Sequence, residues 1–108
     1  MKISKLQIQV DEWIKKYGVR YFNELTNMAI LTEEVGELAS IIARKYGEQS
    51  FKKEDSHDLG SEMADILFVL LCLANQTNIN LEKYFNDKIK YKTKRDLQRH
   101  KKNKKINL

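Results

Sequence analysis

The near absence of helix-breaking residues constrains the fold of this chain more than any other feature. The 108 residues include no proline and only four glycines, so little in the sequence interrupts a helix. Apolar residues recur at helical spacing in four segments, at residues 3–17, from 21–25 to about 46, from 56–58 to about 76, and from 81 to about 97. A chain of this length holds one core. We therefore predict one all-α domain, residues 1–108, resembling a four-helix bundle.

Residues with known end preferences mark the limits of these helices. Gly18 is a plausible end for the first helix, and Gly47 stands where a C′ glycine would end the second. Ser56 or Asp58 can cap the third helix, and Asn80 can cap the fourth. Beyond about residue 99 we expect a basic, frayed tail.

Two short acidic steps lie on the second and third predicted helices. Glu34 and Glu37 are three residues apart, as are Glu62 and Asp65, so each pair shares one helical face. Neither pair lies on a uniformly polar face, because apolar residues such as Ile66 continue the same lines. We expect these carboxylates to be partly buried, which is costly without a partner.

A hard divalent cation would offset the repulsion within such a cluster. If the two helices pack side by side, four carboxylates converge, and Mg²⁺ binds carboxylate oxygens together with substrate phosphates. The alternative is two exposed helical faces that happen to carry acids. The recurrence of the step on successive helices favours the metal, and with it phosphate chemistry.

Basic residues concentrate at the C-terminal end. Residues 88–105 carry a net charge of +9 and the remaining residues −4. Lys88, Lys92 and Arg95 share nearly one helical face, which suits either phosphate binding or a solvated helix end. A nucleic-acid-binding or structural helical module that uses this helix is the alternative function. The acidic body and the lack of a base-reading motif count against nucleic acid as a partner.

The apolar content of the third helix predicts an oligomer. On the second helix, a main apolar stripe comprises Leu25, Met28, Leu31, Val35, Leu38, Ala39 and Ile42. The third helix is apolar on every side from residue 66 to 74, and four short helices can hardly cover it alone. We therefore expect a homodimer or homotetramer.

Composition also bears on the compartment. That nine-residue apolar run is far shorter than the roughly 20 residues of a membrane span. Residues 1–13 lack a signal-peptide pattern, and the single cysteine, Cys72, suits a core position and no disulfide framework. We expect a soluble cytoplasmic protein without a membrane partner.

The acidic steps resemble a known signature. Glu33-Glu34-x-x-Glu37, followed after 24 residues by Glu62-x-x-Asp65, is similar to the EExxE…ExxD motif of the MazG-like nucleotide pyrophosphohydrolases. These belong to the all-α NTP pyrophosphatase superfamily, with the dimeric dUTPases and dCTP pyrophosphatases. The resemblance covers roughly residues 25–99. Lys92 stands where many relatives carry asparagine.

The resemblance implies a MazG-type fold and hydrolysis of a nucleoside triphosphate to a monophosphate and pyrophosphate. Glu34, Glu37, Glu62 and Asp65 would then hold Mg²⁺, or alternatively Mn²⁺. Glu33 would orient or deprotonate the attacking water. The polyphosphate would be bound by Lys88, Lys92 and Arg95. For Trp13, packing in the core or an interface is one reading, and stacking on the base is the other.

Overall fold

The computed structural model describes residues 2–55 and 57–107, and this part of the chain is helical without a strand. The four helices are α1 (Ile3–Trp13), α2 (Glu24–Tyr46), α3 (Leu59–Gln76) and α4 (Leu81–Asp96), and a π-helical turn, η1 (Ile14–Gly18), extends α1. The predicted all-α class and its four helices are confirmed. The fourth helix ends one residue before the predicted limit.

Side-chain caps fix where three of the helices begin. Asn23, Asp58 and Asn80 accept hydrogen bonds from the backbone N–H groups three residues later, at 2.8, 3.0 and 3.2 Å. Asn80 was predicted from the sequence, and Asp58 was one of two candidates. The other candidate, Ser56, lies outside the described residues.

Two connections differ from simple helix ends. The first helix reaches Gly18 as predicted, but its last turn is π-helical, and Val19 follows with φ 70° and ψ −58°. Arg20 N–H donates to the Gly18 carbonyl at 2.8 Å, which closes a strained γ-turn. Gly47 ends α2 in an extended conformation, where a Cβ atom would overlap the Ala43 carbonyl oxygen. A glycine is therefore required sterically at this helix end.

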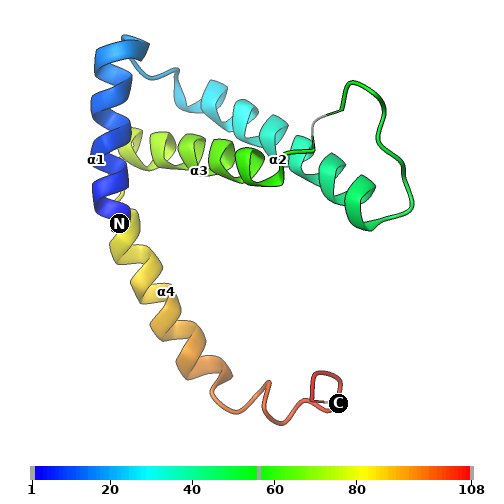
Figure 1. Ribbon diagram of the computed structural model, residues 1–108. Coiled ribbons are helices and arrows are strands. Elements are labelled where there is room, and N and C mark those ends of the chain that lie inside the picture. Colours follow the sequence, from blue (N-terminus) through cyan, green and yellow to red (C-terminus); the bar gives the residue numbers. More distant parts are fainter. Residues whose placement is uncertain (1, 56, 108) are drawn as a thin grey trace.

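Helices α2 and α3 form a hairpin whose members lie side by side, as Figure 1 shows. Helix α1 crosses one end of the hairpin and packs on α3. Their contact is centred on Val10, Ile14, Leu71 and Cys72, all at least nine-tenths buried. The core position predicted for Cys72 is confirmed. Helix α4 begins at α1 and extends away from α2 and α3 (Figure 1).

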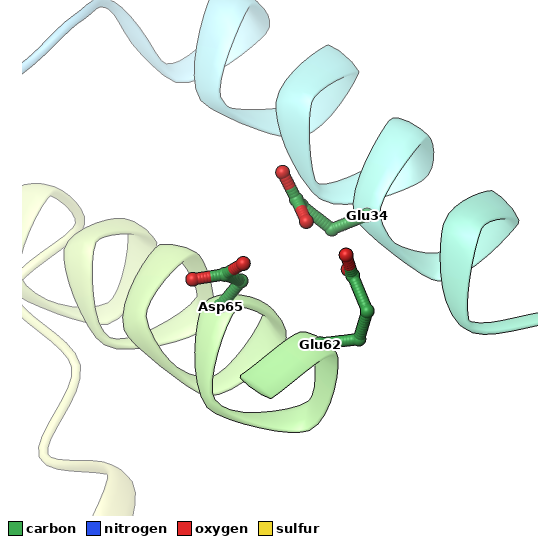
Figure 2. A group of neighbouring side chains, drawn as sticks. All are labelled: Glu34, Glu62 and Asp65. Carbon is green, nitrogen blue, oxygen red and sulfur yellow. The ribbon is translucent and has the colours of Figure 1, made fainter. Parts of the chain in front are cut away.

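The single chain is not compact. Its radius of gyration is 17.8 Å, whereas a globular domain of this length has about 13 Å. Among the described residues, no large side chain is fully buried. The main apolar stripe of α2 is largely open, with Leu25 81% and Val35 47% exposed. A second, partly apolar strip of α2 contains Glu34 and Ile41. Glu34 reaches toward α3 (Figure 2), and Ile41 is buried.

Helix α3 has the length and mean hydropathy of a membrane span, with 18 residues at 1.3. Its ends argue for a different role. Glu62 and Asp65 lie in its first two turns, and near its C-terminus Asn75 and Gln76 hydrogen-bond to α1 and to the segment before α2. These contacts fit a central bundle helix that binds its neighbours through polar side chains.

Candidate functional site

Three carboxylates from two helices meet between α2 and α3. One oxygen each from Glu34, Glu62 and Asp65 lies within 4.8 Å of the others. Figure 2 shows Glu34 reaching from α2 toward the two acids on α3. The helical spacing of three between Glu62 and Asp65 places both on the α3 face toward α2. The cluster therefore follows directly from the side-by-side packing of the hairpin.

Glu62 is the most buried member of this cluster. It is 8% exposed, and its Oε2 atom has no hydrogen-bond partner among the described residues. Burial, followed by hydrogen bonding and repulsion involving Glu34 and Glu37, raises the pKa of Glu62 to about 7. A buried, unpaired carboxylate oxygen among like charges is expensive without a cation.

The other two acids of the signature differ in position. Glu37 approaches Glu62 from α2 and contributes to its raised pKa, although Glu37 is itself exposed in the single chain. Glu33 is also exposed, and it lies beside Glu34 in the sequence but outside the three-carboxylate group. The expectation of partial burial is thus met by Glu34 and Glu62, and not by Glu37 and Asp65.

A cleft of about 440 Å³ adjoins the cluster on the side of α1. Glu34 and Asp65 lie on its wall, and four aromatic side chains contribute to the rest. Trp13 and Phe68 meet there edge to face, with ring centroids 5.5 Å apart. Trp13 is 47% exposed, so part of its side chain remains accessible for either stacking or an interface.

A smaller cavity of about 290 Å³ is lined by Glu37 and Glu62, together with Arg44 and Asp55. Arg44 Nε lies 3.1 Å from Asp55 Oδ2, and its Nη1 donates to the Ser40 carbonyl at 3.2 Å. This ion pair ties the loop between the hairpin helices to α2. The acidic cluster therefore lies between a cleft that is aromatic in part and a charged cavity.

The basic residues predicted to bind phosphate lie elsewhere in the single chain. Lys88, Lys92 and Arg95 are on α4, which extends away from the hairpin (Figure 1). Arg95 pairs with Asp96 through two contacts of 3.1 and 2.7 Å, and Lys88 and Arg95 both lie against the Tyr91 ring. One chain does not bring these cations to the carboxylates.

Three residues at the site were missed by the sequence reasoning. Asn27 and Phe68 line the cleft, and Arg44 lines the smaller cavity. A helical signal existed for all three, because Asn27 precedes Glu34 by two turns and Phe68 follows Asp65 by three residues. Arg44 lies seven residues after Glu37, also on its face. These spacings indicate that the residues share a helical face with the acids, but they do not indicate which residues contact a substrate.

Comparison with known proteins gives one consistent result. Residues 22–101 match the family described as the MazG nucleotide pyrophosphohydrolase domain. The uncharacterized protein YpjD of Bacillus subtilis (strain 168) is 42% identical over 91 residues, which span 83% of this chain and 81% of that protein.

Solved structures agree with the sequence match. The crystal structure of Bacillus subtilis YpjD is similar with a TM-score of 0.74 and 39% identity, covering 85% of this chain and 92% of that one. The crystal structure of a Bacillus-conserved MazG protein, a nucleotide pyrophosphohydrolase, is similar with a TM-score of 0.71 and 36% identity. The similarity covers 84% of this chain and 88% of that one. The acidic signature, the helical fold and these similarities lead to one conclusion: the chain belongs to the MazG nucleotide pyrophosphohydrolase family.

Proposed function

We propose that this protein is a Mg²⁺-dependent enzyme that hydrolyses nucleoside or deoxynucleoside triphosphates to monophosphates and pyrophosphate. The observation that carries the proposal is the three-carboxylate cluster, in which Glu62 is buried and its Oε2 atom has no hydrogen-bond partner in the part of the chain that the structure describes. The adjoining aromatic cleft has a volume that suits the nucleoside part of such a substrate. Family membership supports the reaction class.

The donor set fits a hard cation. Glu34, Glu62 and Asp65 supply carboxylate oxygens at one point, and Glu37 lies beside Glu62. We propose these four as ligands of Mg²⁺, with Mn²⁺ as an alternative. When bound, the cation would neutralise phosphate charge and lower the pKa of a water molecule.

The remaining residues would bind the substrate and accept the proton of the attacking water. Glu33 would orient the attacking water or accept its proton as a general base. Trp13, which lines the cleft and is partly exposed, would stack on the base. Lys88, Lys92 and Arg95 would bind the polyphosphate and offset charge on the leaving pyrophosphate.

We further propose that the active form is at least a homodimer. The low compactness of the single chain and the open stripe on α2 support a partner that covers this surface. In such an assembly α4 could bring its cations to the site of a partner chain, which one chain alone does not do. We expect the protein to work in the cytoplasm.

A single assay tests the reaction and the site. Pyrophosphate release is measured from a panel of NTPs and dNTPs, with Mg²⁺ or with a chelator. We expect metal-dependent release by the wild type and none by Glu34→Gln. Glu24→Gln is the matched control, because it makes the same change in the first turn of the same helix, outside the cluster. Equal activity of the wild type and Glu34→Gln would refute the proposed site.

A further inference from the structure

Asn27 is a buried polar side chain on the cleft side of α2. It is 5% exposed and lies on the wall of the 440 Å³ cleft. Buried amides are normally fully hydrogen-bonded, and Asn27 is bonded at one end only. Its Nδ2 group donates to the Phe22 carbonyl at 3.3 Å and to Gln76 Oε1 at 2.7 Å. No described residue donates to its Oδ1 atom.

The orientation of this amide is determined by a backbone carbonyl. Gln76 Nε2 also donates to the Phe22 carbonyl oxygen, which can only accept. Gln76 must therefore turn its Oε1 atom toward Asn27, and the NH₂ group of Asn27 donates a hydrogen bond to this oxygen. Both hydrogens of Asn27 Nδ2 are then used, so that Oδ1 is left as a fixed acceptor. Asn27 lines the cleft, so this acceptor is placed to meet a ligand there.

Asn27 lies at a suitable distance from the carboxylates to meet a base. It precedes Glu34 by seven residues on one helix, which is about 10 Å along the axis and nearly the same direction around it. Both side chains line the same cleft. That separation is comparable with the distance from the α phosphorus of a nucleotide to the hydrogen-bonding edge of its base.

The polar side chains of Tyr21 and Arg20, which also line the cleft, already make hydrogen bonds within the protein. Tyr21 donates its hydroxyl hydrogen to Asp11 at 2.5 Å, and its oxygen accepts from Asn75 at 3.1 Å. Arg20 is exposed and donates to the Tyr21 carbonyl at 2.8 Å. Away from the carboxylates, Asn27 Oδ1 is therefore a buried, oriented acceptor to which no described residue donates.

We propose that Asn27 Oδ1 selects nucleobases that carry an exocyclic amino group, as adenine and cytosine do. This inference rests on the proposed function, because it assumes that the cleft receives the base of a nucleotide. An amino hydrogen would satisfy the free acceptor. A keto oxygen at the same position would face it lone pair to lone pair, and both atoms would be buried without a partner.

The test removes only the amino group from the ligand. The kcat/KM for ATP is compared with that for purine riboside triphosphate, which lacks the 6-amino group, and CTP is compared with its 4-deamino analogue. We expect the wild type to lose about 5- to 150-fold for at least one pair, the cost of an unpaired buried acceptor. In Asn27→Leu the ratio of kcat/KM for the amino-bearing nucleotide to kcat/KM for its amino-free analogue should fall to near one.

Asn23→Leu is the matched control, because it makes the same change at the cap of the same helix, outside the cleft. It should keep the wild-type ratio. Equal rates for both pairs with the wild type would overturn the proposal, whether or not Asn27→Leu folds. An undiminished ratio in folded Asn27→Leu would overturn it as well.

A binding measurement separates this inference from the proposed reaction. Trp13 is the single tryptophan and lies in the cleft, so its fluorescence can report binding of AMP, CMP and their amino-free analogues without hydrolysis. Tighter binding of an amino-bearing nucleotide would support the selectivity even if no triphosphate were cleaved. Hydrolysis without any such preference would leave the reaction intact and refute the role of Asn27.

Discussion

Replacing Glu62 by glutamine tests whether the buried carboxylate is held at a cost that only a cation offsets. The pKa of Glu62 is about 7 in the folded chain, against an ordinary value of 4.5. A raised carboxyl pKa means that folding favours the protonated form. The associated stability is fully present below about pH 4.5 and is lost as the pH rises through about 7. Glutamine carries no charge at any of these values.

The expected result in the absence of divalent cations is a pH-dependent difference in unfolding free energy. Wild type and Glu62→Gln should be similarly stable near pH 4.5. The variant should become the more stable of the two as the pH rises, and the difference should level off above about pH 7. Urea unfolding in EDTA, followed by circular dichroism, measures the difference at each pH.

Adding Mg²⁺ at neutral pH should make the wild type more stable than Glu62→Gln. A cation present at a hundredfold excess over its Kd stabilises the folded wild type by about 2.7 kcal/mol. This corresponds to a Tm increase of roughly 10–20 °C for a domain of this size. Glu62→Gln should gain much less, because it lacks the buried ligand. If the wild type is equally stable at pH 4.5 and 7.5 in EDTA and does not respond to Mg²⁺ or Mn²⁺, the reasoning is wrong.

Three further outcomes follow from the same site and fold. Asp65→Asn should abolish hydrolysis while circular dichroism shows an unchanged helical content, and wild-type turnover by this variant would remove the residue from the site. Arg95→Ala should lose roughly 1.5–3 kcal/mol of transition-state binding in kcat/KM, whereas a chain truncated after His100 should keep its activity. Sedimentation equilibrium at micromolar concentration should give at least twice the chain mass of 12.8 kDa, and a monomer would contradict the assembly.

The helices and their beginnings could be predicted because they depend on local chemistry. Asn80 caps α4 as its type and position indicate, and the four helical segments follow from the spacing of apolar residues. The acidic pairs on α2 and α3 share faces for the same reason. What local rules omit is the π-helical turn before Val19 and the γ-turn at that residue, since valine rarely adopts a positive φ.

The packing of each face could be predicted less well. The sequence shows two apolar lines on α2, and periodicity alone does not decide which one α3 covers. In the structure Glu34 reaches toward α3 and Ile41 is buried, while Leu25 and Val35 stay open. The apolar periodicity also does not predict where α4 lies relative to the carboxylates, because that position depends on contacts between helices. Asn27 was missed because its role depends on Gln76, 49 residues away.

The central claim is that this protein cleaves a nucleoside triphosphate between its α and β phosphorus atoms at the carboxylate cluster. Phosphorus NMR of the reaction with the best substrate of the panel, in Mg²⁺, follows every phosphate product in one experiment. We predict that nucleoside monophosphate and pyrophosphate accumulate in equal amounts, and that neither forms with Glu34→Gln. Accumulation of nucleoside diphosphate and inorganic phosphate, or an intact triphosphate throughout, would contradict the claim.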